Sequence, residues 1–312
     1  MVKYITIDGG TTNTRISLVK CGEIVDTVKL NVGARSGIDE NSLLKAEIKK
    51  GIIQLLNKNK LIDKEIDRIL ASGMITSEFG LCKLDHIVAP AGIIELNQTK
   101  HETVLEEVSG IPFVFIRGVK TSGEKLCECD IMRGEETELM GIITSGDGKC
   151  IYVLPGSHSK IIYTDENGRI TKFVTMLTGE MIFSLTNSTI LKDAVDLSIV
   201  NTNTQYLQTG FEYCKDKGIN EALFKTRILK NIYNCTAEQI YSFFLGVVLC
   251  AEILQIIKSD VKKVVIGGKA QIKNAMAELL RRNSDKMVVC LSEEEVNKST
   301  AMGMIKIYEL NK

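Results

Sequence analysis

Residue types that bind phosphate follow one another near the start of the chain, from Asp8 to Arg15. Apolar alternations flank this segment, so we expect a β-hairpin with a glycine turn. Such a turn exposes backbone N–H groups to an anion, here at Gly10. The hydroxyl groups of Thr11 and Thr12 can donate to phosphate oxygens. The segment therefore has the composition of a phosphate-binding turn.

Two charged residues complete this hairpin. Arg15 can neutralise phosphate oxygens, and Asp8 can hold a metal ion or its water shell. An ordinary hairpin with a polar tip has the same composition, so the segment alone leaves both interpretations open.

The same pattern occurs again 146 residues later, without a gap. Gly10 aligns with Gly156, and the glycine of the next turn aligns with Gly168. Residues 151–177 thus repeat the strand–turn–strand–turn–strand pattern of residues 5–30, which indicates an internal duplication. Two facing copies would place two glycine hairpins around one phosphate chain.

The second copy has Leu154 at the position of Asp8, so it keeps the shape of the turn and lacks the acid. Lys160 can face phosphate oxygens, although a lysine at a strand edge is the plain alternative. His158 can donate to a phosphate or only satisfy the turn. The predicted phosphate-binding residues of this copy are Gly156, Ser157, His158, Ser159 and Lys160.

A cluster of acids lies between the two copies, where a helix is expected to begin near Gly134. Carboxylates in a first turn are favoured by the helix dipole, which is sufficient to explain Glu135 and Glu136. The dipole does not explain Asp130 and Arg133. The planar guanidinium of Arg133 suits bidentate contact with a substrate carboxylate.

Ligand contacts are also expected where a strand at 66–71 ends in small residues. These residues are Ser72, Gly73 and Met74. A plain turn is the alternative interpretation.

A second such strand end occurs late in the chain. The strand expected at 261–266 is followed by Gly267 and Gly268 and then by a helix. Backbone without a Cβ can approach a base or ribose closely, so this turn suits nucleotide contact.

The remaining elements follow from apolar spacing. Helices are expected at 40–57, 99–108, 179–192, 204–217, 219–230, 236–258 and 270–282 and around Gly303, strands at 113–116 and 287–291, and a linker at 118–124. The apolar run from Phe243 to Ile257 is interrupted by Glu252 and is too short to span a bilayer, so it predicts a buried helix.

Composition limits the classes of function. The 312 residues suffice for two domains, and 39 basic and 39 acidic residues give no net charge, so neither a nucleic-acid nor a membrane partner is expected. Nine scattered cysteines, an odd number, indicate reduced thiols in a cytosol and not a disulfide framework. The first apolar residues already form a strand, so we expect no signal peptide and a cytoplasmic protein.

Together, these features resemble the actin/Hsp70/sugar kinase superfamily. Asp8 to Arg15 resembles its first phosphate motif, Leu154 to Lys160 its second, and Ile266 to Gly268 its adenosine motif. The helices near Gly134 and Gly303 resemble the two helices that connect its lobes. The resemblance implies the two-lobed α/β actin-like ATPase (ribonuclease H-like) fold, with duplicated mixed sheets and the nucleotide in the interlobe cleft.

The sequence is more closely similar to one family, the 2-dehydro-3-deoxygalactonokinases. The shared motifs are Ser72-Gly73-Met74, Pro90-Ala91, the run from Asp130 to Thr137, the run from Pro155 to Lys160, and Thr178-Gly179-Glu180. The sequence departs from the family at Gly9, where tryptophan is usual, and at Cys129, where proline is usual. The first departure could alter packing beside the phosphate-binding turn.

The resemblance implies an ATP-dependent kinase that phosphorylates a hydroxyl of 2-dehydro-3-deoxy-D-galactonate, with Mg²⁺ held by Asp8 through water. Residues 1–143 would form the acceptor-binding lobe and residues 144–312 the nucleotide-binding lobe. Nucleotide contacts are implied at Asp8, Gly10, Thr11, Thr12, Arg15, Gly156, Ser157, His158, Ser159, Lys160, Gly267 and Gly268, and substrate contacts at Ser72, Gly73, Met74, Pro90, Ala91, Arg133 and Glu180.

The superfamily also places a catalytic carboxylate at the start of its first connecting helix. This position falls on Asp130, Glu135 or Glu136. The last two lie about 100° apart around a helix, so at most one of them faces a given acceptor.

Two alternatives stay open. A kinase for another sugar acid or an aminosugar would keep the fold, whereas an actin-type ATPase or filament protein would need no small acceptor. The acidic cluster before the helix favours a small acceptor. The sequence does not fix the oligomeric state, and a homodimer is left open.

Overall fold

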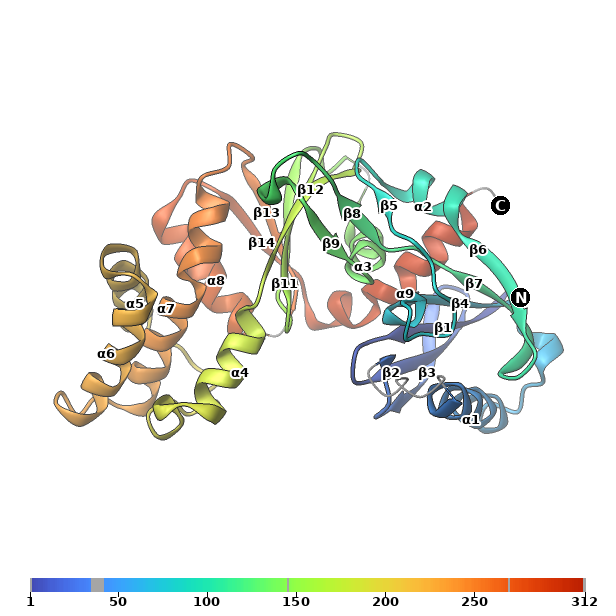
Figure 1. Cartoon of the computed structure of the whole chain (residues 1–312), viewed down its shortest axis with the longest axis horizontal. Helices are drawn as coiled ribbons and strands as arrows, with labels where there is room; N and C mark the ends of the chain where they lie inside the picture. The colour runs from blue at the N-terminus through green and yellow to red at the C-terminus, as the bar shows by residue number, and fades with distance from the viewer. Residues whose placement is uncertain (1, 35–41, 145, 269, 311–312) are drawn as a thin grey trace. The chain divides into compact units, whose positions relative to one another are not determined.

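The computed structural model describes residues 2–34, 42–144, 146–268 and 270–310, which form two compact units (Figure 1). Unit 1 contains Met1–Asp147, Glu166–Lys172 and Glu294–Lys312, and unit 2 contains Gly148–Asp165 and Phe173–Glu293. The C-terminal segment returns to unit 1, so the units are not two consecutive halves of the chain. The binding roles expected for 1–143 and 144–312 stay predictions.

Unit 1 is built from a mixed sheet, a small second sheet and helices. Its elements are β1 (Lys3–Gly9), β2 (Thr14–Lys20), β3 (Glu23–Leu30), α1 (Ser42–Lys58), η2 (Asp63–Glu65), β4 (Arg68–Gly73), η3 (Met74–Thr76), β5 (Ile87–Val88), α2 (Ile93–Thr99), β6 (His101–Leu105), β7 (Ser109–Phe115), β8 (Val119–Thr121), η4 (Leu126–Glu128), β9 (Asp130–Met132), α3 (Glu135–Ile142) and α9 (Glu293–Glu309). The first two residues of the helix predicted at 40–57 lie outside the described residues.

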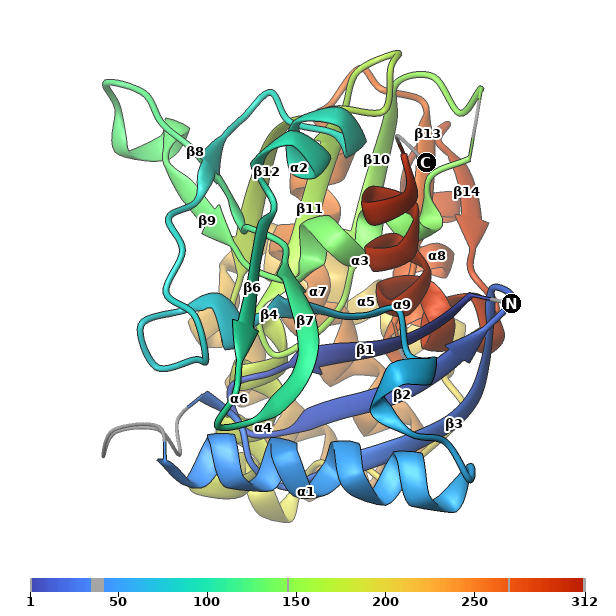
Figure 2. The same cartoon turned by 90° about the vertical axis from the view of Figure 1, so that its right-hand side faces the viewer.

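The main sheet of unit 1 has the strand order β3-β2-β1-β4-β7-β6. Strands β1, β2 and β3 form the predicted antiparallel meander, and β4 and β7 continue from β1 in parallel. Helix α1 packs along one face of the meander (Figure 2). It does so because its apolar residues recur at helical spacing and are buried: Leu44, Ile48, Ile52 and Leu55.

The other face of this sheet carries the polar residues. Ile7 and Ala71 belong to the apolar core on the α1 side. Asp8 and Ser72, the next residues of β1 and β4, are paired in register and therefore point to the opposite face. Both lie at the carboxyl ends of parallel strands, where ligands usually bind in α/β sheets.

Helices α3 and α9 contact each other backbone to backbone at two glycines. A Cβ at Gly303 would lie 1.8 Å from the carbonyl oxygen of Thr137, and one at Gly141 would lie 1.9 Å from that of Ser299. Only glycine permits this approach. The two helices that the sequence predicted near Gly134 and Gly303 are confirmed.

Two expectations for residues 99–124 are wrong. Residues 101–105 form β6, an edge strand antiparallel to β7, and not a helix. The β-branched Thr103 and Val104 suit a strand, and pairing with β7 decides the conformation. The expected linker at 118–124 contains β8, whose Val119 is buried and pairs with Met132 of β9. A three-residue strand in a polar segment leaves no periodic signal.

Unit 2 contains a second mixed sheet and a helical layer. Its elements are β10 (Cys150–Leu154), β11 (Ser159–Thr164), β12 (Ile170–Met176, whose first three residues belong to unit 1), α4 (Thr178–Ser188), η5 (Ile190–Asp193), α5 (Thr204–Lys217), α6 (Ile219–Asn231), α7 (Ala237–Ile257), β13 (Lys263–Ile266), α8 (Ala270–Asn283) and β14 (Met287–Cys290).

The second sheet confirms the internal duplication. Its order, β12-β11-β10-β13-β14, repeats the meander followed by a parallel crossover strand that unit 1 shows. Strands β10, β11 and β12 begin within one residue of the positions that the 146-residue offset predicts from β1, β2 and β3.

Helix α7 is the core of unit 2. It is surrounded by α5, α6 and α8 (Figure 1). By length and composition α7 is a helix that could span a membrane, but 78% of its most apolar window is buried in the fold. It is the buried helix that the sequence predicted.

The glycine contact between α3 and α9 can be tested with Gly303→Ala. Alanine favours a helix by about 1 kcal/mol over glycine. We nevertheless expect the free energy of unfolding to fall by about 1–3 kcal/mol, because the added methyl overlaps the Thr137 carbonyl. Gly110→Ala is the control, since its Cβ would meet only Glu106 at 3.9 Å. Urea unfolding measures both, and an unchanged or stabilised Gly303→Ala protein would contradict the close contact.

Candidate functional site

The turn between β1 and β2 is held by the chain that follows β3. Gly10 donates its N–H to Asn13 at 2.8 Å and accepts from the N–H of Ala34 at 3.1 Å. A Cβ at Gly33 would lie 2.5 Å from the carbonyl carbon of Thr11. The hydroxyl of Thr12 accepts from the Asn13 amide at 3.0 Å, so its O–H is left to donate. The turn is thus ordered, with Thr11 and Thr12 at its exposed tip.

Gly9 lies against the turn η3. A Cβ on Gly9 would lie 2.7 Å from the Cβ of Ile75. Ile75 therefore occupies the space beside Gly9, and any larger residue at this position would require η3 to move. The departure from the family at Gly9 is accommodated by this packing.

Asp8 is the acid at the end of β1. Burial raises the pKa of Asp8, the cross-strand Arg15 lowers it, and the charge of Glu135 raises it further. Within the described part of the chain, no hydrogen bond reaches its carboxylate. Asp8 is therefore an acid that a ligand or hydrated cation can engage.

Glu138 of α3 is a further acid near Asp8 and Glu135, and the sequence did not predict a role for it. Burial first, and then the charges of Asp8 and Glu135, raise the pKa of Glu138 to about 8. The hydroxyl of Ser299 in α9 acts in the opposite direction and lowers this pKa. The only available signal was spacing, since Glu138 follows Glu135 by three residues and lies on the same side of α3.

The hydroxyl of Ser72 is fully buried and unsatisfied. Among residues 2–34, 42–144, 146–268 and 270–310, nothing hydrogen-bonds its Oγ. Ser72 pairs in register with Asp8, so both side chains point to the same face. A buried polar group without a partner is costly, so this hydroxyl favours a ligand or water beside Asp8.

Three backbone glycines bring the elements of this site together. Gly73 has φ 86°, and its Cβ would lie 2.5 Å from the Gly9 carbonyl oxygen. Gly134 has φ 115°, and its Cβ would lie 3.2 Å from the Cα of Gly73. The ends of β1 and β4 and the start of α3 thus meet in unit 1.

Arg133 is occupied by protein acceptors. One terminal nitrogen donates to the carbonyl oxygen and hydroxyl of Thr76, at 2.8 and 2.6 Å, and the other to Leu84 O and His86 Nδ1, at 3.1 and 3.3 Å. Burial and the Arg133 charge lower the pKa of His86 to about 4, so its neutral Nδ1 can accept. The predicted contact between Arg133 and a substrate carboxylate stays a prediction, which these bonds disfavour.

The two adjacent glutamates of α3 have different environments. The carboxylate of the fully buried Glu136 accepts from the Gly134 N–H, at 2.8 Å for the shorter contact, and from the Thr137 hydroxyl at 2.9 Å. Burial and the Glu135 charge raise the pKa of Glu136 to about 8. Glu135 accepts from the Arg133 N–H at 3.0 Å, is partly exposed, and is the acid that acts electrostatically on Asp8.

Asp130 and the Pro90–Ala91 segment lie elsewhere in unit 1. Asp130 begins β9, pairs with Thr121 of β8, and accepts from the N–H of Ile131 at 2.7 Å. Ala91 is buried and exchanges both backbone hydrogen bonds with Ile170. Met74, in η3, is partly exposed beside the glycine contact.

In unit 2, the turn between β10 and β11 packs on the start of α4. A Cβ at Gly179 would lie 2.3 Å from the Gly156 carbonyl oxygen and 2.7 Å from the Cα of Ser157. The N–H of Glu180 donates to Ser157 O at 3.2 Å, and the Glu180 carboxylate lies 3.0 Å from His158 Nε2. Glu180, predicted to bind substrate, thus contacts the turn that the sequence predicted to bind phosphate in unit 2.

The hydroxyl of Ser159 points into the core of unit 2. It donates to the carboxylate of Glu252 at 3.1 Å, and Thr178 donates to the same carboxylate. An ionised Glu252 therefore takes the single proton of Ser159, whose expected phosphate contact would have to come from its backbone N–H. Lys160, the next residue, is buried.

The glycine pair after β13 packs on the same turn. Gly267 donates its N–H to Val153 O at 2.9 Å. Gly268 has φ 79°, and its Cβ would lie 3.0 Å from Pro155, the residue before Gly156. The predicted adenosine and phosphate motifs are thus adjacent in unit 2.

The residues of unit 1 fit a hydrated Mg²⁺ better than a fully coordinated metal. Across the described ranges, no three acid, histidine or cysteine side chains are placed to hold a metal ion. Mg²⁺ needs fewer protein ligands, because it keeps several waters and binds one or two carboxylates together with phosphates. Asp8, whose carboxylate accepts no hydrogen bond from the described residues, suits that role.

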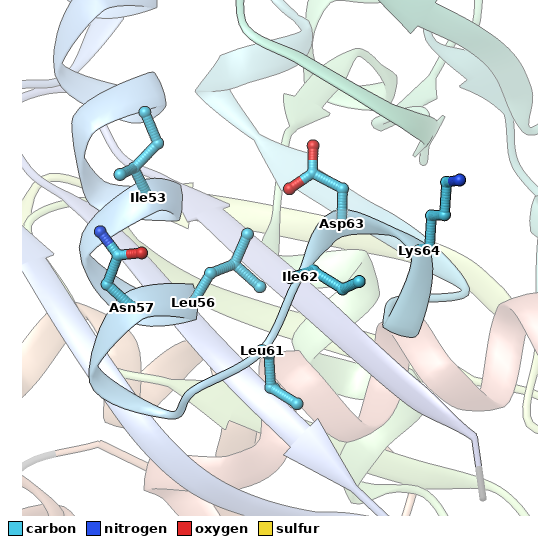
Figure 3. Close-up of a pocket in the computed structure, with 7 residues that line it drawn as sticks. All are labelled: Ile53, Leu56, Asn57, Leu61, Ile62, Asp63 and Lys64. Atoms are coloured by element: carbon cyan, nitrogen blue, oxygen red, sulfur yellow. The ribbon is translucent and has the colours of Figure 1, made fainter.

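A surface hollow of about 450 Å³ lies between α1 and the turn that follows it (Figure 3). Ile53, Leu56 and Leu61 are among the residues that line it. It contains none of the predicted site residues, and the charged and unsatisfied groups described above are better evidence for a site.

Comparisons with known proteins report on the family and the fold. A curated Rhizobium meliloti (strain 1021) protein named "Probable 2-dehydro-3-deoxygalactonokinase DgoK1" is 30% identical over 130 residues, which are 41% of this chain and 40% of that relative. A crystal structure from Sinorhizobium meliloti, of a protein assigned as a 2-dehydro-3-deoxygalactonokinase, has a TM-score of 0.77 at 19% identity and covers 98% of each chain. Component A of the Acidaminococcus fermentans (R)-2-hydroxyglutaryl-CoA dehydratase has a TM-score of 0.54 at 15% identity and covers 100% of each chain.

The likeness to these two solved structures shows the α/β fold. The model of the 2-keto-3-deoxy-galactonokinase family matches residues 8–307, which include both glycine turns and the start of α3. The chain therefore belongs to the 2-keto-3-deoxy-galactonokinase family.

Proposed function

We propose that this chain is an ATP-dependent sugar-acid kinase that phosphorylates a hydroxyl of 2-dehydro-3-deoxy-D-galactonate. Membership of the family supports the substrate. The observation that carries the proposal is the grouping of Asp8, Ser72 and Glu135 at the carboxyl ends of β1 and β4. It offers a cation-binding acid, an unsatisfied hydroxyl and a candidate base on one face of a sheet.

Phosphoryl transfer depends mainly on positioning and on neutralising charge. We assign phosphate contacts to the β1–β2 turn and to the β10–β11 turn, with Arg15 as a cation beside Asp8. Mg²⁺, when bound, would neutralise phosphate charge, and Asp8 would hold it through water. The glycine pair 267–268 would contact the adenosine, and a cytoplasmic location would supply ATP.

We assign the general base to Glu135. It is the partly exposed acid whose charge acts on Asp8, so it lies near the expected phosphate. Glu136 is fully buried and accepts the Gly134 N–H, so we assign it to holding the start of α3. Asp130 begins β9 and is not among the charges that shift the pKa of Asp8.

The activity can be tested with a coupled assay of ADP release over a panel of sugar acids, sugars and aminosugars. We expect turnover with 2-dehydro-3-deoxy-D-galactonate and little ADP without an acceptor. Turnover with a different acceptor would contradict the proposed substrate, but the proposal that the protein is a kinase would stand. Hydrolysis that does not depend on any acceptor, or sedimentable polymer formed with ATP, would favour an actin-type ATPase instead.

The base can be identified with Glu135→Gln. We expect kcat to fall by about 10²–10⁴-fold, because proton transfer from the acceptor is lost, while ATP still binds. Asp130→Asn is the matched control and should keep near wild-type kcat. Loss of turnover in Asp130→Asn or in Glu136→Gln, with an active Glu135→Gln enzyme, would move the base to that residue.

Binding of a sugar acid and of an uncharged sugar tests whether Arg133 holds the fold or binds the substrate carboxylate. Arg133→Ala removes four hydrogen bonds that hold η3 and residues 84–86. We expect a lower melting temperature and weaker binding of the sugar acid and of its uncharged sugar analogue by the same factor. ATP affinity should change less. A loss confined to the acid would instead show that Arg133 binds the substrate carboxylate directly.

A further inference from the structure

Glu252 is a buried acid in the middle of the most apolar helix of the chain. Its side chain is 1% exposed, and its neighbours Cys250, Ile253 and Ile256 are buried in the core of unit 2. Burial raises the pKa of Glu252, and its two hydroxyl partners lower it. Burying a carboxylate against neutral donors is costly, so stability alone does not account for an acid at this position.

One partner of Glu252 lies at the end of the turn between β10 and β11, and the other lies on the helix that packs against this turn. Ser159 ends the turn and begins β11, and its hydroxyl donates at 3.1 Å. Thr178 begins α4, and its hydroxyl donates to the other carboxylate oxygen. Both hydroxyls are buried, at 1% and 5% exposure. One carboxylate thus joins α7, β11 and α4.

The next residue after Thr178 contacts the turn itself. Gly179 lies directly on Gly156 and Ser157, and Glu180 donates its N–H to Ser157. Movement of Thr178 would therefore shift the surface on which the turn rests. Movement of Ser159 would shift the turn from its other end.

We propose that Glu252 is a positioning residue for nucleotide binding: it fixes Ser159 and Thr178 so that the turn at residues 156–158 presents its backbone N–H groups to phosphate. This inference rests on the proposed ATP-dependent function. Glu252 touches no substrate in this scheme and acts through the two hydroxyls.

The test is the affinity of the full chain for a non-hydrolysable ATP analogue with Mg²⁺, measured by calorimetry below the melting temperature of each variant. Glu252→Gln keeps the size of the side chain but replaces one acceptor with a donor. We expect its Kd to rise by about tenfold, the size of one mispaired hydrogen bond. The KM for the sugar acid should stay within about twofold in the same variant.

A matched control separates positioning from general destabilisation. Ile253→Ala removes packing from the next residue of α7, which is also fully buried. We expect a lower melting temperature with unchanged Kd. Thr178→Val removes the hydroxyl that donates to Glu252 and keeps the shape of the residue. It should raise the Kd for the ATP analogue, and it gives a second test if Glu252→Gln folds poorly. The Kd of the double variant should not exceed that of the weaker-binding single variant, because both act through one contact.

Wild-type affinity in both Glu252→Gln and Thr178→Val would overturn the positioning role and leave the kinase assignment intact. If Ile253→Ala lost as much affinity as Glu252→Gln and Thr178→Val, the positioning role would also be overturned. The losses would then reflect general destabilisation of unit 2. A wild-type chain that does not bind the analogue would overturn the proposed function and this inference together.

Discussion

The candidate site of unit 1 depends on the close backbone approach of Gly9, Gly73 and Gly134. Gly73 and Gly134 have positive φ, and a Cβ on Gly73 would overlap the Gly9 carbonyl. The contact lets β1, β4 and the start of α3 end at one place. It therefore places Asp8, Ser72 and Glu135, from three segments of the chain, on one side of the sheet. Without this backbone contact, Asp8 would be an isolated acid at the end of a strand.

The electrostatics of the site follow from this packing. The charge of Glu135 raises the pKa of both Asp8 and Glu138, the charge of Asp8 also raises that of Glu138, and Arg15 lowers the pKa of both Asp8 and Glu138. Mutual repulsion among acids favours protonation or a bound cation. A hydrated Mg²⁺ that accompanies a phosphate chain would relieve this repulsion, which agrees with a kinase and gives the acids a role beyond the helix dipole.

Much of this arrangement could be predicted because it has a local signal. The glycine hairpins, their repetition and the apolar spacing of α7 are all visible in short segments. The acceptors of Arg133 could not be assigned, since Thr76 and Leu84 lie about fifty residues away and reach it only through tertiary packing. The helix expected at 99–108 was wrong because residues 101–105 pair with the next strand, β7, and the spacing of apolar residues does not report that pairing.

The position of the acid distinguishes the two duplicated hairpins. In the first, Asp8 ends the strand, and its carboxylate has no hydrogen bond to any residue that the structure describes. In the second, Leu154 takes that position, and the nearby acid, Glu252, comes from helix α7 and accepts two buried hydroxyls. A satisfied acid in the core holds the turn, whereas an unsatisfied acid at a strand end can engage a ligand. The duplication thus yields two turns of similar shape, one with the acid Asp8 at the end of its first strand and the other with Leu154 at that position.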